Sequence, residues 1–441
     1  MRLGNAAWGV PMSWQATLRT RFQGLRARLA GDRFVRNVGW MGLSELGIRV
    51  SRLLATIILA RLLTPEDYGL AAIVLTTHEF IRVFTRNGIG DKLVQADATD
   101  VEELCVTAYW LNWLLGGGLF LIQTIGSFAV ARFFGNPKLI MPIMAIGCTY
   151  LIYPLAMVQT ALIRRENRLN VFSLTNLAQV VTDNLLTGGL ALMGLGMWAI
   201  VLPKLLVAPI WVLMMYRYQA WRPVQAFTIR HWQRILGFGS RILGVELLNT
   251  LRENIDYLLI GRFLGLAPLG VYYFAFNAGL GLSLSAVNAM GVSMYSDLCD
   301  VRSDPGELQR RFNRNLRTTA LVIGPLVALQ SSLAPLYVPI VFGAQWVERG
   351  AVPVLILICL SALSRPFANA ASMLFRAVGL PQVDLRWNLI FTVLLALAIL
   401  VGTGWGILGV AVAVMVTHLV LQPLYLVWAR RLLHSPGREL A

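Results

Sequence analysis

Charged residues recur inside stretches of this sequence that are otherwise apolar enough to cross a membrane. A charge at the bilayer centre costs at least ~2.5 kcal/mol on insertion scales, so each one needs a functional or structural reason. The basic residues, which could grip a phosphate or carboxylate in a bidentate way, are Arg49, Arg52, Arg82, Arg252 and Arg365. The acidic residues, which could balance them or carry a proton or sodium ion, are Glu45, Glu79, Glu246, Glu253 and Asp256.

The spacing of these charges places several of them on shared helix faces. Glu45, Arg49 and Arg52 follow the i, i+4, i+7 pattern of one face, and Glu79 and Arg82 lie on one arc of the next apolar segment. We therefore expect a water-filled cavity lined by these segments. The alternative is that neighbours such as Glu45–Arg49, Glu79–Arg82 and Arg252–Asp256 neutralise one another as internal salt bridges.

The composition explains which elements must carry these charges. The chain is 57% hydrophobic and only 14% charged, which excludes an ordinary soluble protein. Apolar windows of ~20 residues recur about twelve times, and each is long enough to span a hydrocarbon core. The sequence thus predicts an all-α polytopic membrane protein with helices near 39–63, 68–89, 105–131, 139–162, 171–193, 196–216, 238–261, 268–292, 318–342, 351–375, 385–402 and 405–428.

A short stretch of the sequence occurs twice. Arg61, Leu63 and Gly69 reappear as Arg262, Leu264 and Gly270, each 201 positions later, and Glu45 and Glu246 share this offset. Transporters are commonly built from two repeated helical halves with the substrate between them. We therefore predict two repeated six-helix bundles.

The repeat and the polar segments divide the chain into five parts. We predict a basic amphipathic N-terminal segment at 1–36, a first bundle at 37–218, a linker at 219–236, a second bundle at 237–428 and a tail at 429–441. The charged stretch 296–317 is interpreted as an amphipathic surface helix. The sequence does not decide whether Met1 or Met12 starts the protein.

The net charge of +16 would suggest nucleic acid in a soluble protein, but its distribution indicates a membrane orientation. Most Lys and Arg residues fall in the termini and in alternate loops, which we assign to the cytoplasm by the positive-inside rule. The opposite loops hold few basic residues, namely Arg61, Arg132, Lys138, Arg262 and Arg349. Both termini should therefore be cytoplasmic, and no nucleic-acid partner is expected.

Other chemistries find little support in the sequence. The four cysteines and four histidines lack metal-ligand spacing, so no metal site is expected. A phosphate-cradling GxxxxGK[ST] loop is absent, so the chain carries no ATPase of its own. The outer loops are too short for the clustered catalytic groups of a membrane polymerase or ligase. We expect a transporter rather than an enzyme, although sequence alone does not exclude a scaffold.

Several motifs resemble those of one known family. Residues 37–40 (NVGW), 60–69 (ARLLTPEDYG) and 87–90 (NGIG) are similar to the opening of bacterial polysaccharide and O-antigen flippases. Those flippases belong to the multidrug/oligosaccharidyl-lipid/polysaccharide exporter superfamily. Residues 254–256, 259–262 and 269–272 look like the start of that family's second half.

This resemblance implies an inner-membrane protein whose two bundles form a V. It implies alternating-access transfer of an undecaprenyl-diphosphate-linked oligosaccharide to the periplasmic leaflet, for exopolysaccharide or O-antigen synthesis. It also implies coupling to an H⁺ or Na⁺ gradient, no other cofactor, and polysaccharide polymerase and assembly proteins as partners beside membrane lipids. By matching, Arg49, Arg52, Arg82 and Arg252 fall where cationic cavity residues would lie.

Two alternatives within the superfamily stay open at this point. One is a cation-coupled drug exporter, which would favour an acidic and aromatic cavity over one rich in arginine. The other is a lipid II flippase, although those proteins usually have two further spans that this chain lacks. The sequence does not reveal the sugars of the cargo, the coupling ion or the oligomeric state.

Overall fold

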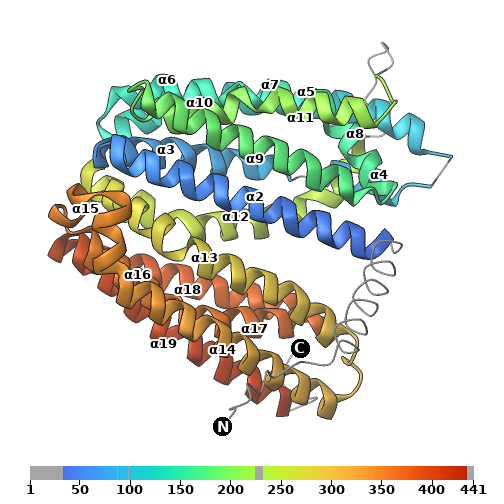
Figure 1. The fold of residues 1–441 in the computed structure, drawn as a ribbon. Coiled ribbons are helices and arrows are strands. Elements are labelled where there is room, and N and C mark those ends of the chain that lie inside the picture. Colours follow the sequence, from blue (N-terminus) through green and yellow to red (C-terminus); the bar gives the residue numbers. More distant parts are fainter. Residues whose placement is uncertain (1–32, 87, 98, 224–231, 435–441) are drawn as a thin grey trace, which may run out of the picture.

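A computed structural model describes residues 33–86, 88–97, 99–223 and 232–434, apart from the side chains of 33–46, 169, 233–242, 282 and 432–434. Every regular element in this part of the chain is a helix (Figure 1). Residues 1–32 of the predicted N-terminal segment and parts of the linker and tail fall outside the described residues, whereas residues 33–36 belong to the first helix. The first half contains α2 (Arg33–Leu62), α3 (Pro65–Arg82), η1 (Val83–Thr85), α4 (Ile89–Gln95), α5 (Val101–Phe134), η2 (Pro137–Leu139), α6 (Ile140–Gly147), α7 (Thr149–Ile152), α8 (Pro154–Arg165), α9 (Leu169–Leu192), α10 (Trp198–Leu206) and α11 (Ala208–Tyr218).

The second half follows after the linker with the same helical character. Its elements are α12 (Trp232–Phe263), α13 (Leu266–Cys299), α14 (Pro305–Tyr337), the π-helix η3 (Val338–Phe342), α15 (Ala344–Glu348), α16 (Ala351–Ser361), α17 (Arg365–Ala377), α18 (Pro381–Gly402), η4 (Thr403–Trp405) and α19 (Gly406–His434).

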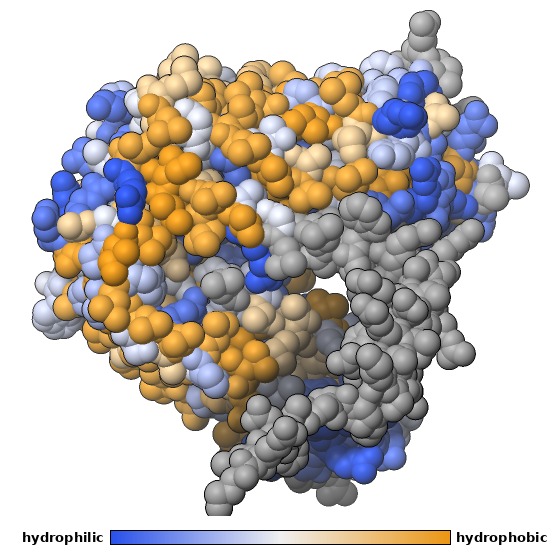
Figure 2. Space-filling model, in the orientation of Figure 1, coloured by the Kyte–Doolittle hydropathy of each residue, from blue (hydrophilic) through white to orange (hydrophobic). Residues whose placement is uncertain are grey.

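The length and apolarity of these helices indicate a membrane protein. Among the described residues, five helical stretches are long and apolar enough to cross a membrane, or up to seven if each of two bent pairs is one span. Four other long helices are not apolar enough to count as spans, because they carry polar or charged residues in their middle turns. These helices are α2, α3, α9 and α12. Hydrophobic residues cover much of the face seen in Figure 2. The predicted all-α membrane fold is confirmed, and about twelve spans are consistent with these elements if the polar helices also cross.

Three predicted spans are broken rather than continuous, and a proline lies at each break. Pro154 opens α8, Pro209 lies in the first turn of α11, and Pro366 lies in the first turn of α17. Proline has no N–H to continue a helix but suits a first helical turn. The pair α6–α8 is bent by 52° as a result.

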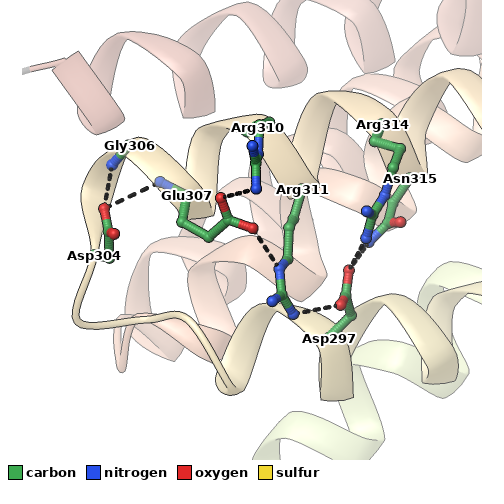
Figure 3. A network of polar contacts seen from close by, with 8 residues as sticks. All are labelled: Asp297, Asp304, Gly306, Glu307, Arg310, Arg311, Arg314 and Asn315. Atoms are coloured by element: carbon green, nitrogen blue, oxygen red, sulfur yellow. Dashed lines mark hydrogen bonds and ion pairs between the residues drawn. The ribbon is translucent and has the colours of Figure 1, made fainter.

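The charged stretch 296–317 is not a separate surface helix, so that interpretation is wrong. It forms the extended ends of α13 and α14, joined by a short turn (Figure 3). Arg311 donates to Asp297 on α13 at 2.8 Å and to Glu307 on its own helix at 2.9 Å, while Asp304 caps α14. These pairs let both helices continue past the apolar region in which hydropathy would end them.

The two halves meet through the repeated glycines. A Cβ built on Gly69 of α3 would lie 2.1 Å from the carbonyl oxygen of Leu266, and one on Gly270 of α13 would lie 1.7 Å from that of Pro65. Pro65 and Leu266 are themselves 201 positions apart, as are the two glycines. The contact is therefore reciprocal between the two copies of the repeat, and only glycine allows the backbones to approach so closely.

The repeated arginines also reach across to the opposite half. Arg61 donates from Nη2 to the carbonyl of Ile340 at 2.6 Å and from Nε to that of Val341 at 3.0 Å, both in η3. The guanidinium of Arg262 lies 5.3 Å from the ring centroid of Phe133 at the end of α5. Each arginine thus ties the first helix of its own half to the third long helix of the other half.

An aromatic cluster fills the same end of the molecule. Trp346 stacks on Phe274 with ring centroids 3.9 Å apart, meets Tyr68 edge to face, and donates from Nε1 to the carbonyl of Ala60 at 2.8 Å. Residues of both halves share one buried hydrophobic cluster here. The halves converge at the end that carries α15 and separate toward the end that carries α4 (Figure 1).

The reciprocal glycine contact makes a testable prediction about stability. Gly69→Ala and Gly270→Ala should each destabilise the closed end by about 1–3 kcal/mol or more, because a methyl group would overlap a backbone carbonyl that cannot move alone. Thermal unfolding of the purified protein measures this effect. Gly117→Ala is the control, because a Cβ at that position meets nothing within 4 Å. Equal melting temperatures for all three variants would contradict the packing.

Candidate functional site

A cavity of about 880 Å³ lies between the two halves. Its walls come from α3, α6, α7, α9 and α10 and from the facing helices α12, α13, α17, α18 and α19. Figure 2 shows the hollow between the halves on one face of the molecule. This volume is at the upper end of the roughly 300–1,000 Å³ that small-ligand pockets occupy. The cavity is therefore large enough for a polar group the size of a diphosphate and attached sugars.

Among the described residues, ten charged ones line this cavity, five basic and five acidic. The arginine surplus expected from the sequence is therefore not present at the cavity wall, where formal charges cancel. What the cavity can bind depends on which charges are already paired. The ten residues are Glu79, Arg82, Asp183, Lys204, Arg252, Glu253, Asp256, Arg365, Arg376 and Asp384.

The basic residues of the first half are paired within that half. Arg82 lies 2.5 Å from Glu79 one turn earlier on α3, which is the internal pair that the sequence offered as an alternative. Lys204 on α10 lies 2.5 Å from Asp183 on α9. Both cations are neutralised locally, so this wall offers little net charge to a ligand.

A second polar network holds α3 against α5 and α7 beside these pairs. His78 Nδ1 lies 3.2 Å from Gln123 Oε1, and the amide of Gln123 donates to the carbonyl of Ile143. Tyr150 donates to the backbone carbonyl of His78 at 3.1 Å and stacks on its ring. This network fixes the turn of α3 from which Glu79 and Arg82 project.

The second half is organised around a buried carboxylate that sequence reasoning missed. Asp384 on α18 is only 4% exposed and accepts four hydrogen bonds. The donors are Ser372 Oγ at 2.9 Å, Arg376 Nε at 3.1 Å, Asn388 Nδ2 at 3.0 Å and Tyr425 OH at 3.0 Å. The i, i+4 spacing of Asp384 and Asn388 was the one local signal, whereas Tyr425 reaches the site only through the fold.

Two arginines in the second half have no carboxylate partner among the described residues. Arg252 on α12 donates to Asn388 Oδ1, so the Asp384 network holds it in place without neutralising it. Arg365 opens α17; its Nε is buried without a hydrogen-bond partner, and its guanidinium lies 5.9 Å from the ring centroid of Phe276. A guanidinium that is desolvated and unpaired strongly favours an incoming anion, and its planar fork suits a phosphate or carboxylate.

The predicted ion pair between Arg252 and Asp256 does not form. Asp256 instead accepts from Tyr272 OH at 2.8 Å and from the backbone N–H of Tyr257 at 2.9 Å, and it is 8% exposed. Both donors are neutral and no described cation lies within ion-pair distance of this buried carboxylate, although the charge of Arg365 acts on it from further away. Glu253, one turn earlier, is exposed at the cavity wall.

Three of the remaining predicted residues, Arg49, Arg52 and Glu246, do not line the cavity wall. Arg49 and Arg52 are exposed on α2, on the side away from the face on which Gly47 and Ser51 pack against α9. Glu246 pairs with Arg86 and so joins the two halves near the wide end. The side chain of Glu45 falls outside the described residues. A role in substrate binding or ion coupling stays a prediction for all ten sequence-selected residues.

Comparison with known proteins gives the chain its relatives. A family model with the description "polysaccharide biosynthesis protein" matches residues 58–350. The lipopolysaccharide biosynthesis protein WzxC of Escherichia coli (strain K12) is 22% identical over 92% of this chain and 83% of its own length. The teichuronic acid biosynthesis protein TuaB of Bacillus subtilis (strain 168) is 23% identical over 79% of this chain and 72% of its own length.

Solved structures agree on the fold. A multidrug resistance MATE family transporter of the MOP superfamily in an inward-facing conformation superposes with a TM-score of 0.71, at 15% identity over 88% of this chain and 94% of that one. The lipid II flippase MurJ in an inward closed conformation also gives 0.71, at 13% identity over 89% and 87%. These likenesses confirm the predicted all-α polytopic membrane fold, whereas the predicted bounds of the two bundles stay a prediction.

The Asp384 network predicts a large loss of stability when its centre is neutralised. Asp384→Asn should cost about 3–5 kcal/mol, because it removes the partner of Arg376 and the acceptor of several buried donors. Thermal unfolding of the purified protein measures the loss. Asp300→Asn, at an exposed position in the α13–α14 turn, should change stability by less than about 0.5 kcal/mol. If both variants have the same melting temperature, the Asp384 network does not hold α12, α17, α18 and α19 together.

Proposed function

The chain belongs to the family of polysaccharide biosynthesis proteins, and from this premise we propose that it is the flippase of a lipid-linked saccharide. In this proposal it moves an undecaprenyl-diphosphate-linked oligosaccharide from the cytoplasmic to the periplasmic leaflet, for exopolysaccharide or O-antigen synthesis. It is a multi-pass membrane transporter and not an enzyme. The names of WzxC and of the succinoglycan biosynthesis transport protein ExoT of Rhizobium meliloti (strain 1021), 25% identical over 80% of this chain, support this assignment.

The observation that carries the proposal is the pair of unneutralised arginines in a cavity between the halves. Arg252 and Arg365 face a volume that is closed by the glycine contact at one end. A diphosphate carries the charge and the oxygen geometry that two such guanidinium groups would bind. The saccharide would occupy the rest of the polar wall, where asparagine side chains from α9, α12 and α13 are available.

The shape of the molecule suits one step of an alternating-access cycle. The halves are closed where the short outer loops lie and separate at the other end (Figure 1). We assign the wide end to the cytoplasm of a bacterial inner membrane, because loops there carry most of the Lys and Arg. Both termini would then be cytoplasmic, and polymerase and other assembly proteins would take the saccharide at the far side.

A cation-coupled exporter of small molecules is the second candidate, and one observation favours it. Glu253 and Asp256 form no ion pair among the described residues and could receive a positively charged drug. We prefer the flippase because both oxygens of Asp256 already accept hydrogen bonds, whereas Arg365 Nε is left unsatisfied. The likeness to a lipid II flippase concerns the fold and leaves the identity of the saccharide to experiment.

We further propose that transport is coupled to an H⁺ or Na⁺ gradient through Asp256. A buried carboxylate with only neutral donors is costly in its charged form, so binding a proton or a sodium ion would stabilise it. Arg365 and Tyr272 share its surroundings and would respond to that change.

The arginine site predicts a specific pattern of export defects. Arg252→Ala and Arg365→Ala should each lower affinity for the lipid-linked diphosphate about 10- to 100-fold, because a charge-assisted hydrogen bond contributes about 1.5–3 kcal/mol. Surface polysaccharide should fall and lipid-linked precursor should accumulate in cells. Lysine variants should be intermediate, since lysine keeps the charge but not the planar fork.

Arg349→Ala is the matched control, because Arg349 is exposed and lies in an outer loop. Normal export and no precursor accumulation in both cavity alanine variants, at wild-type protein levels, would refute the proposed site. The same two measurements on Arg49, Arg52 and Arg82 variants would show whether cations off this wall, or paired on it, also contact the cargo.

The coupling proposal is tested in proteoliposomes with an imposed pH or sodium gradient. Asp256→Asn should still bind undecaprenyl diphosphate but should transport at one rate with and without the gradient, because the variant side chain cannot change charge. The wild type should respond to one of the two gradients. An Asp256→Asn variant that responds as strongly as the wild type would exclude this carboxylate.

A further inference from the structure

A narrow apolar groove of about 270 Å³ lies outside the cavity, between α14, α17 and α19. Its lining is hydrophobic except for Ser364, and the position of Gly324 leaves open space because no atom lies within 4 Å of a Cβ built there. The flanking residues Leu321 and Val420 are 75% and 52% exposed, so the groove opens on the surface that faces lipid. Its remaining walls are Ala320, Ile323, Leu363, Pro366, Phe367, Leu419 and Pro423.

The groove and the charged cavity lie on adjacent faces of the same two helices. On α17, Arg365 and Asn369 line the cavity, whereas Pro366 and Phe367 line the groove. On α19, Gln422 lines the cavity and its neighbour Pro423 lines the groove. Helices α17 and α19 therefore form the wall between a lipid-facing slot and the cavity that holds Arg365.

That separating layer is built at two helix irregularities. The hydroxyl of Ser364, on the groove side, donates to Gln422 Oε1 on the cavity side at 3.0 Å, and both residues are buried. Ser364 lies in the break between α16 and α17, and Pro423 interrupts the hydrogen bonds of α19. This hydrogen bond therefore links the groove side of one interrupted helix to the cavity side of the other.

We propose that this groove holds the first isoprenoid units of the cargo's polyprenyl chain while Arg365 holds the diphosphate, an inference that rests on the proposed function. The chain of an amphiphile cannot remain in a polar cavity and must leave it for lipid close to the bound head group. The groove is the apolar slot that shares a wall with the unpaired arginine. An apolar cavity of roughly 150 Å³ admits a benzene molecule, so this groove has room for roughly ten carbons.

The energetics predict an effect on position more than on affinity. The polyprenyl chain enters the groove from lipid and not from water, so no hydrophobic transfer energy is gained and only packing contacts change. Filling the groove should therefore reduce affinity by less than the loss of a charged hydrogen bond does. The sharper observable is where the chain lies while the head group is bound.

The test places photoreactive p-benzoylphenylalanine at position 320 in the groove, at position 328 on the same helix facing lipid, or at position 288 on the cavity wall. Each protein is reconstituted in phosphatidylethanolamine–phosphatidylglycerol nanodiscs with radiolabelled undecaprenyl diphosphate. We expect at least about fivefold more label at 320 than at 328, and loss of this excess with Arg365→Ala, because the head group then no longer holds the chain at the groove. Equal labelling at 320 and 328 would mean that bulk lipid fills the groove and would overturn the inference.

A variant that fills the groove tests whether the groove matters for export. Ala320→Leu should slow export about 3- to 10-fold, as expected for lost packing contacts, while Ala328→Leu leaves export unchanged. Wild-type export in Ala320→Leu counts against the groove. Label at 288 without excess label at 320 rejects the groove and leaves the flippase intact. Absence of label at all three positions, with normal export in Arg365→Ala, rejects the proposed function itself.

Discussion

The direct backbone contact between α3 and α13 is the constraint on which the rest of the architecture depends. Gly69 faces the carbonyl of Leu266 and Gly270 faces that of Pro65, so the two copies of the repeat lie across a local pseudo-twofold axis. Any side chain at either glycine would push the halves apart. Because this contact, the crossed arginines and the Trp346 cluster lie at one end, the halves are joined there and separate elsewhere. The cavity is the consequence of that one-sided closure.

Electrostatic pairing, and not the number of charges, sets what this cavity can bind. Equal numbers of basic and acidic residues line it, yet they are not distributed alike. In the first half each cation has its own carboxylate, whereas in the second half Asp384 engages Arg376 and orients Arg252 through Asn388. Arg365 has no such partner among the described residues and lies beside the wall that separates the cavity from the apolar groove. Helix α17 therefore carries both the arginine that can bind an anion and residues of the lipid-facing groove.

The sequence anticipated those features that local spacing controls. The pair of Glu79 and Arg82, which the sequence offered as an alternative, does form, because residues three apart on one helix are neighbours whatever surrounds them. The equally local pair of Arg252 and Asp256 does not form, since Asn388 and Tyr272 from other helices compete for the two groups. The sequence also showed that Arg49 and Arg52 share one helix face, but it did not show toward which neighbour that face is turned. Packing of α2 on α9 through Gly47 turns both away from the cavity wall.

Hydropathy, charge bias and the 201-residue repeat were enough by themselves to determine a helical membrane transporter of two related halves, because these properties depend on each segment and its solvent. Only the tertiary structure decided that Asp384 is the centre of a network in the second half, that Arg252 and Arg365 form no ion pair with any described carboxylate, and that a groove lies behind the cavity wall. Those features arise where side chains from three or four helices compete for one another. Such competition is settled by packing geometry, which no single segment of the sequence encodes.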